Sequence, residues 1–236
     1  LPVTYLSFPS AKDPVSEIAH PDFSTIEAIT VGKWNDFIFT SIQPKIKIDS
    51  ILDDIKTRLK NFPFDSIYYS PEYSRTYNLD ANWALYCENY LEGLHVPFVH
   101  KGLNSEIDIK SYKTKTLDNG VLQYTDSKDK NVYAYYYWIF PNIMINVYPW
   151  GISINIIKPI NMNKTKVSFL SYVYDESKLD QGAGANLDKV EREDEFVVEG
   201  VNKGLKSRYY STGRFSPSME KGVHHFHRLI SESLNS

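Results

Sequence analysis

Cysteine is nearly absent from the sequence, which contains only Cys87 among 236 residues. One cysteine excludes an intrachain disulfide framework, a CxxC redox pair and any cluster or zinc site held by four cysteines. A strong excess of either charge is also missing, because 26 lysines and arginines face 29 aspartates and glutamates, for a net charge of −3. We therefore expect neither a nucleic acid nor a membrane as partner.

No basic segment followed by an apolar run opens the chain, so no signal peptide is expected and we place the protein in the cytoplasm. The length suits one large domain whose core needs no disulfide or metal. A hydrophobic content of 42% and a charged content of 23% are typical of a globular protein. The first residue is Leu1 rather than Met, which indicates a processed or trimmed product.

The longest run without a charged residue covers 131–157 and is long enough to span a bilayer. It contains Pro141 and Pro149, and apolar and polar residues alternate over 152–156. A period of two is typical of a strand and not of a membrane helix. We therefore predict buried strands here.

The pattern along the chain predicts strands, then helices, then a long antiparallel run and two further helices, which favours an α+β fold over a parallel α/β fold. The predicted strands are 25–42 with a turn near Gly32–Asp36, part of 68–77, a hairpin over 110–127, and three or four strands over 132–174. The predicted helices begin at Asp49 or Ser50, run from Asp80–Asn82 to Pro97 and from 186 to 207, and begin again at Ser216-Pro217. In the hairpin, Asn119-Gly120 predicts a type I′ turn with positive φ angles.

Helical periodicity places Asp194 at the centre of the apolar stripe of the helix over 186–207. The stripe consists of Leu187, Val190, Val198, Val201 and Leu205, whereas Glu191, Glu193, Glu195 and Glu199 fall on its flanks or outside it. An inward carboxylate is costly unless it is paired, hydrogen-bonded or bound to a metal. From this helix alone, a buried salt bridge or a polar gap explains Asp194 as well as a metal does.

Two histidines, His95 and His100, flank Pro97, which is expected to end the preceding helix. Glu88, Glu92 and His95 share one face of that helix, and the turn after Pro97 can bring His100 back toward His95. Two imidazoles and a carboxylate form a facial triad that suits non-haem Fe(II), and zinc hydrolases use the same ligands. Unrelated core or surface histidines are the alternative.

A third histidine group occupies 224–227, on the last predicted helix. The predicted buried stripe of that helix consists of Val223, Phe226, His227, Ile230 and Leu234, with His224 and His225 toward its flanks. We expect His227 in the core or in an interface, and His224 and His225 in contact with solvent. A metal role for these histidines is the alternative.

Three segments resemble the large (α) subunits of Rieske-type ring-hydroxylating oxygenases. Residues 82–100 read NWALYCENYLEGLHVPFVH and are similar to the iron-binding segment of that family. Residues 190–207 read VEREDEFVVEGVNKGLKS and are similar to its second signature. Residues 213–230 read GRFSPSMEKGVHHFHRLI and resemble the tail of the choline-monooxygenase and quaternary-amine branch. The resemblance extends over residues 25–236.

The resemblance implies a helix-grip (START-like) domain, in which a curved antiparallel sheet wraps a long C-terminal helix. By position, His95, His100 and Asp194 match the Fe(II) ligands. Glu92 matches the acidic residue that links two metal centres across a subunit boundary, and Asn89 matches the asparagine near the iron. Family members are trimers that activate dioxygen and hydroxylate or demethylate a small organic substrate, with electrons from a ferredoxin or reductase.

The cysteine count departs from the family, because its electron-transferring Rieske [2Fe–2S] domain carries a CxH…CxxH pattern that this sequence lacks. We therefore expect a mononuclear-iron catalytic domain over 25–236, preceded by a lead-in over 1–24 from a missing Rieske domain. The chain would be a fragment, or a homologue that has lost that domain. In both cases the electrons must come from a cluster outside this chain.

The substrate and two other functions stay open at this point. The 18 tyrosines fit a pocket lined by 133–148 and 168–174, where aromatic faces attract a quaternary ammonium group by about 0.5–2 kcal/mol each. Tyrosines are also good strand residues, which explains their number without such a pocket. The choice of a quaternary amine therefore rests mainly on the resemblance of the tail and on Glu92, and an aromatic acid or ring substrate stays open. The other functions are a metal-free, ligand-binding helix-grip module and a zinc hydrolase built on the same two histidines and carboxylate.

Overall fold

The computed structural model describes residues 4–5, 29–41, 47–102, 111–125, 134–179 and 187–235. The chain divides into two compact units, Leu1–Phe64 and Asp65–Ser236. Within the described residues, no helix is long and apolar enough to cross a membrane.

The described part of the first unit contains a three-stranded sheet of order β1-β3-β2 and the helix α1. Its elements are β1 (Thr4–Tyr5), β2 (Ile29–Trp34), β3 (Phe37–Ser41) and α1 (Asp49–Arg58). The predicted pair of strands and the helix start at Asp49 are confirmed. Asn35 adopts a positive φ of 48° in the turn between β2 and β3, a conformation that asparagine tolerates better than most residues. Ile51 and Ile55 of α1 are fully buried, as the apolar stripe predicts.

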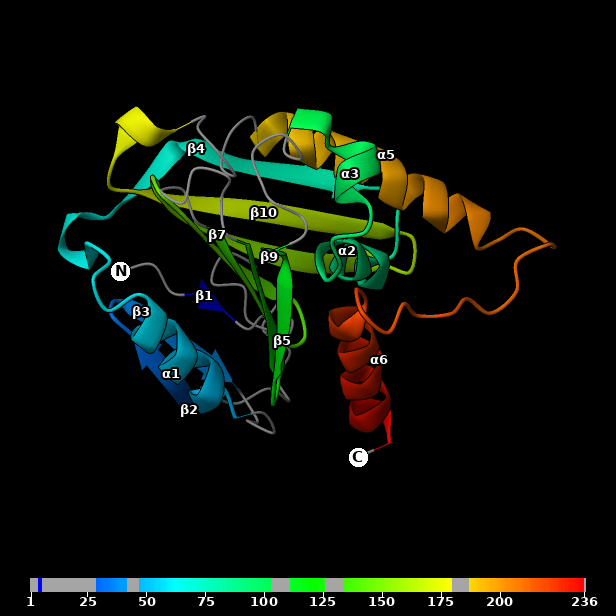
Figure 1. Cartoon of the computed structure of the whole chain (residues 1–236), viewed down its shortest axis with the longest axis horizontal. Coiled ribbons are helices and arrows are strands. Elements are labelled where there is room, and N and C mark those ends of the chain that lie inside the picture. Colours follow the sequence, from blue (N-terminus) through cyan, green and yellow to red (C-terminus); the bar gives the residue numbers. More distant parts are fainter. Residues whose placement is uncertain are drawn as a thin grey trace, which may run out of the picture. The chain divides into compact units, whose positions relative to one another are not determined.

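The second unit is built on a seven-stranded antiparallel sheet of order β4-β10-β9-β8-β7-β6-β5 (Figure 1). Its strands are β4 (Tyr68–Leu79), β5 (Lys113–Leu117), β6 (Gly120–Thr125), β7 (Ala134–Ile139), β8 (Ile143–Tyr148), β9 (Gly151–Asn161) and β10 (Lys164–Val173). The uncharged run is confirmed as strands, and all six residues of β8 are buried. Strands that pair with their sequence neighbours over 113–173, together with helices, confirm the α+β class. The helix-grip arrangement stays a prediction.

Among the described residues, four helices and two short 3₁₀ turns accompany this sheet. They are α2 (Trp83–Tyr90), α3 (Val96–Val99), α5 (Leu187–Gly204) and α6 (Lys221–Leu234), and the turns are η1 (Phe64–Ser66) and η3 (Glu176–Lys178). Helix α2 contacts both α5 and α6, and α6 contacts β5 and β6. Figure 1 shows α5 beside β4, and Glu199 of α5 accepts a hydrogen bond of 2.9 Å from the backbone N–H of Asp80.

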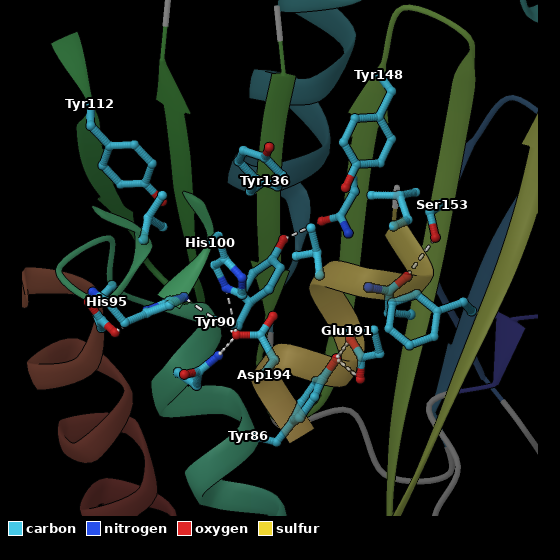
Figure 2. Close-up of a pocket in the computed structure, with 18 residues that line it drawn as sticks. Tyr86, Tyr90, His95, His100, Tyr112, Tyr136, Tyr148, Ser153, Glu191 and Asp194 are labelled. Carbon is cyan, nitrogen blue, oxygen red and sulfur yellow. Dashed lines mark hydrogen bonds and ion pairs between the residues drawn. The ribbon is translucent and has the colours of Figure 1, made fainter. Parts of the chain in front are cut away.

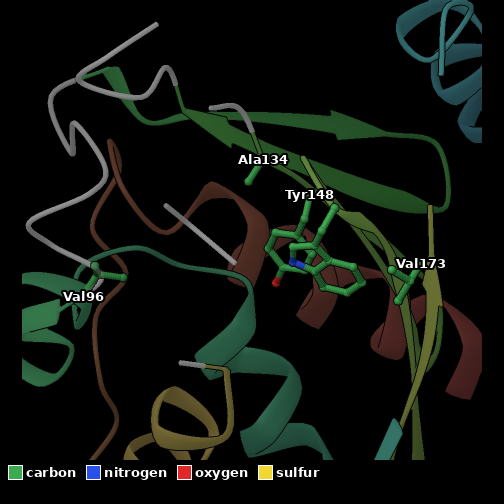
Figure 3. Close-up of a cluster of buried hydrophobic side chains, with 5 residues drawn as sticks. Val96, Ala134, Tyr148 and Val173 are labelled. Atoms are coloured by element: carbon green, nitrogen blue, oxygen red, sulfur yellow. The ribbon is translucent and has the colours of Figure 1, made fainter. Parts of the chain in front are cut away.

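A cluster of buried side chains joins the start of α3 to the sheet (Figure 3). It consists of Val96, Ala134, Tyr148, Trp150 and Val173. The rings of Tyr148 and Trp150 stack with centroids 5.1 Å apart. Because Val96 belongs to this cluster, the chain between His95 and His100 is anchored to the sheet and not free in solvent.

Two predicted helix boundaries and one predicted turn type are wrong. Helix α2 ends near Leu91, whose N–H bonds to the carbonyls of Cys87 and Glu88, and Pro97 lies in the first turn of α3, where its missing N–H costs nothing. Helix α6 begins at Lys221 and not at Ser216. The hairpin turn after β5 has no positive φ at Asn119, and its carbonyl accepts a hydrogen bond from Phe140.

Candidate metal centre and its pocket

The two histidines are held by a tight connection between α2 and α3. Asn82 begins α2 by accepting a hydrogen bond of 3.0 Å from the N–H of Ala84, and the helix ends two turns later. The carboxylate of Glu92 then accepts hydrogen bonds from the backbone N–H groups of Leu94 and His95. Glu92 therefore lies in the turn and does not share a helical face with His95, contrary to the prediction. The short helix α3 returns the chain so that the two imidazole rings lie 5.0 Å apart, at 81° to each other.

Asp194 of α5 completes the group. One ligand atom from each of His95, His100 and Asp194 lies within 4.8 Å of the others. The Asp194 Oδ1 atom is 3.0 Å from Nε2 of His100 and 3.5 Å from Nε2 of His95. The structure therefore brings together the three residues that the sequence singles out.

Each imidazole is oriented by a carboxylate on its outer side. His95 contacts Glu92 through Nδ1, and His100 contacts Glu193 through Nδ1 at 2.8 Å. When Nδ1 carries the proton that bonds to the glutamate, Nε2 carries a lone pair. Both Nε2 atoms then face an oxygen of Asp194, an arrangement that needs a positive charge between them. Two imidazoles and one carboxylate, each imidazole supported by a second carboxylate, therefore fit a divalent transition metal.

Burial and charge oppose each other at His100, whose side chain is 1% exposed. Burial alone would lower its pKa, but the hydrogen bonds and negative charges of Asp194 and Glu193 outweigh burial and raise the pKa above its ordinary value. The site is therefore strongly attractive to positive charge, whether this is a proton or a metal ion.

Asn89 lies on the face of α2 that meets α5. Its side-chain amide donates a hydrogen bond of 2.7 Å to Oδ1 of Asp194, and no described contact joins it to either imidazole. Asn89 is therefore close to the three-residue group, as the sequence predicts, and acts on the carboxylate alone.

A cavity of about 120 Å³ opens beside this group. Besides Asn89, Glu92, His95, His100 and Asp194, it is lined by Tyr86, Tyr90, Val96, Tyr112, Tyr136, Asn146, Tyr148, Ser153, Asn155, Phe169, Leu187, Val190 and Glu191. Figure 2 shows Tyr90 beside the imidazole of His100, with Tyr112 and Tyr148 on opposite sides of the pocket. Burial raises the pKa of Tyr90, Tyr112, Tyr136 and Tyr148, so these phenols are neutral at physiological pH. The volume is below the roughly 300–1,000 Å³ of drug-sized ligand sites and favours a small substrate.

Glu191 is not among the predicted site residues, because helical periodicity places it on the flank of the α5 stripe. Glu191 is 6% exposed, whereas Val201 and Leu205 of the predicted stripe are 46% and 36% exposed. Its carboxylate accepts from the hydroxyl of Tyr86 at 2.8 Å and 3.0 Å (Figure 2). Burial, with the charge of Asp194, raises the pKa of Glu191 well above its ordinary value. The spacing of three residues from Asp194 could have identified it, because both then lie on one face.

The histidines of α6 lie away from this group. His227 is exposed and forms an ion pair of 2.6 Å with Glu88, so it does not lie in the core, and the alternative that it lies in an interface stays a prediction. His225 donates to the carbonyl of Leu117 at 2.8 Å, and His224 is exposed. In the part of the chain that the structure describes, none of the three belongs to a metal-ligating group.

The family described as ring hydroxylating alpha subunit (catalytic domain) matches residues 68–118 and 110–236. The chain belongs to this family. Among its relatives, the chloroplastic choline monooxygenase of Arabidopsis thaliana is 36% identical over 176 residues, which cover 68% of this chain and 41% of the relative. The carnitine monooxygenase oxygenase subunit of Escherichia coli K12 is 29% identical over 174 residues, which cover 64% of this chain and 46% of the relative.

Solved structures show the same fold for this member of the ring-hydroxylating family. The quaternary ammonium Rieske monooxygenase in complex with its substrate gamma-butyrobetaine aligns with a TM-score of 0.64 and 22% identity, over 83% of this chain and 57% of that chain. Another structure of a quaternary ammonium Rieske monooxygenase aligns with a TM-score of 0.66 and 22% identity, over 83% of this chain and 58% of that chain. The chain thus spans about half the length of the relatives that it matches.

Proposed function

We propose that this chain contains the catalytic domain of a non-haem Fe(II) oxygenase that hydroxylates or demethylates a small quaternary amine. The observation that carries the proposal is the convergence of two imidazoles and one carboxylate within 4.8 Å, in a chain whose relatives are named monooxygenases. We assign the catalytic domain to residues 25–236 and the lead-in from a Rieske domain to 1–24.

His95, His100 and Asp194 would hold the metal. A bound Fe(II) with three protein ligands keeps open positions and supplies the activation of dioxygen. The protein's own part is to fix these ligands: Glu92 and Glu193 orient the imidazoles, and Asn89 holds the carboxylate. The neighbouring aromatic side chains exclude water from the cavity where the substrate binds.

Electrons are proposed to come from a Rieske [2Fe–2S] centre outside this chain, served by a ferredoxin or reductase, in a homotrimer. Glu92 is the proposed link to that centre, because its carboxylate contacts His95 and also lines the pocket. The cytoplasmic location stays a prediction, and the plant relatives are named chloroplastic.

The proposed substrate class rests on the pocket and on the relatives. Five of the lining residues are tyrosines, at positions 86, 90, 112, 136 and 148, and a sixth aromatic ring is Phe169. Aromatic faces attract a quaternary ammonium group, and the solved relatives are named quaternary ammonium monooxygenases. An aromatic substrate is the second candidate, because the same rings can stack on it.

Metal content after anaerobic purification tests the proposal. We expect close to one iron per wild-type chain, and little iron in His95→Ala and Asp194→Ala because each loses one of three ligands. His224→Ala is the control, since this exposed histidine lies outside the three-residue group. Equal iron content in all four proteins would refute the assignment of the site.

The other two functions give different results in the same experiment. A zinc hydrolase would contain zinc at full occupancy and show hydrolytic turnover. A metal-free module would bind its ligand with no metal at these residues. Both results would contradict the oxygenase proposal.

A further inference from the structure

The buried carboxylate of Glu191 is hydrogen-bonded to a tyrosine hydroxyl and forms no ion pair among the described residues. It lies on α5 and is 6% exposed. Among the described residues, the hydroxyl of Tyr86 is the one hydrogen-bond donor that reaches it, at 2.8 Å and 3.0 Å. The described lining of the cavity contains neither lysine nor arginine.

The neighbouring arginine on the same helix points elsewhere. Arg192 is exposed and pairs with Glu195 at 3.2 Å, and its guanidinium lies 4.8 Å from the ring centre of Tyr77. A buried carboxylate with a single neutral donor is costly unless a positive group comes next to it. The protein therefore retains a side chain that a cationic ligand would stabilise.

The surroundings of Glu191 suit a cation that carries methyl groups. Tyr86, Tyr148 and Phe169 line the same cavity, and aromatic faces attract alkylated ammonium groups. Figure 2 shows the carboxylate of Glu191 on one side of Asp194 and the imidazole of His95 on the other. A molecule whose charged end contacts Glu191 can therefore extend toward the imidazoles.

A second cavity, of about 360 Å³, shares four lining residues with the first one: Ser153, Phe169, Leu187 and Glu191. Its lining includes Arg75 and Lys189, which are both exposed. Lysine and arginine are thus found in the described lining of the second cavity and not in that of the first. Glu191 belongs to the lining that the two cavities share.

We propose that Glu191 is the residue that selects a positively charged substrate, with its carboxylate against the quaternary ammonium group and with Tyr86 as the residue that positions this carboxylate. The inference rests on the proposed function and adds to it the residue that recognises the positive charge of the substrate. Burial raises the pKa of Glu191 in the empty pocket, and an adjacent cation acts in the opposite direction and favours the ionised form.

Binding of two ligands of equal shape tests this inference. Choline and its uncharged carbon analogue 3,3-dimethylbutan-1-ol would be titrated calorimetrically into the iron-loaded full chain and into Glu191→Gln. The wild type should bind choline at least about tenfold more tightly than the analogue, because only choline forms the buried ion pair. In Glu191→Gln, which keeps an oxygen for Tyr86, choline affinity should fall about tenfold while affinity for the analogue changes less than about twofold.

Two further variants separate charge recognition from a structural role. Glu195→Gln makes the same change of charge four residues along α5, outside both cavities, and should leave the preference for choline unchanged. Glu191→Asp keeps the charge and should retain most of the preference, which also provides the test if Glu191→Gln does not fold. An equal loss for both ligands in Glu191→Gln, an unchanged preference, or no preference in the wild type would overturn the inference.

Iron content distinguishes this failure from failure of the proposed function. Glu191 is not one of the three converging residues, so its variants should contain as much iron as the wild type. A wild type that binds choline through Glu191 but holds no iron would refute the oxygenase and leave the charge recognition standing.

Discussion

At the scale of single residues, the candidate site depends on the side chains that form hydrogen bonds with the three converging residues. Glu92 and Glu193 each contact the Nδ1 atom of an imidazole, and Asn89 donates to Asp194. Such contacts fix ring orientation and tautomer, and they make the ligands better electron donors. Substitution of one of these three supporting residues should therefore weaken metal binding without removing a ligand.

Asn89→Ala tests this. The variant removes the hydrogen bond of 2.7 Å on Oδ1 of Asp194 and leaves all three ligands in place. We expect the dissociation constant for Fe(II), measured by anaerobic titration, to rise roughly 10- to 100-fold. Asn235→Ala, at the exposed end of α6, is the control and should leave it unchanged. An unchanged constant in Asn89→Ala would show that this amide has no part in the site.

At the scale of the elements, the sequence predicts which segments are helices and strands better than where they end. The period of two over 152–156 and the apolar stripe of α1 both identify their elements, because one face of each is buried. Pro97 misleads, because proline is compatible with the residue after a helix and also with the first turn of a new one. In the structure Pro97 lies in the first turn of α3, and Glu92 accepts from the N–H groups of Leu94 and His95 in the turn before it.

Glu191 shows that the sequence also predicts poorly which part of the helix α5 is buried. Periodicity identifies the face that contains Asp194, but it also counts Val201 and Leu205, which lie near the far end of the helix and are exposed. When Val201 and Leu205 are counted, the centre of the predicted stripe moves around the helix, away from Glu191. The part of a helix that is buried depends on the elements that pack against it, here β4 and α2. The sequence of the helix alone does not predict how far these elements extend along it.

The packing of α6 on the end of α2 leads to a prediction about stability. A Cβ atom at Gly222 would lie 2.6 Å from the backbone carbonyl oxygen of Leu91, which cannot move like a side chain. Gly222→Ala should therefore lower the free energy of unfolding by about 1–3 kcal/mol, measured with urea. A variant as stable as the wild type would show that α6 does not pack tightly on α2.

Gly200→Ala is the matched control on another helix. Gly200 is exposed on α5, and a Cβ atom there meets nothing within 4 Å. Because alanine favours a helix more than glycine does, this variant should be more stable by about 0.5–1 kcal/mol. The two substitutions are chemically identical, so the opposite signs isolate the contact with Leu91.

At the scale of the whole molecule, the family match and the division of the chain nearly coincide. The match begins at residue 68, and the second compact unit begins at Asp65. The candidate ligands all lie in that unit, but they come from two segments about 95 residues apart in sequence, His95 to His100 and Asp194. The convergence is set by the packing of α2 against α5, and only the resemblance to a family could indicate it beforehand.

A metal that joins these two segments should stabilise the unit Asp65–Ser236. A ligand that binds only the folded state adds about 2.7 kcal/mol at a hundredfold excess over its dissociation constant, which raises the melting temperature of a domain of this size by roughly 5–10 °C. We expect that rise when Fe(II) is added anaerobically to the chelator-treated chain and followed by circular dichroism. Asp194→Ala should show no such rise, because the variant lacks the ligand that links α5 to the two imidazoles. His224→Ala should respond as the wild type does. A similar rise in Asp194→Ala would place the bound metal elsewhere in the chain.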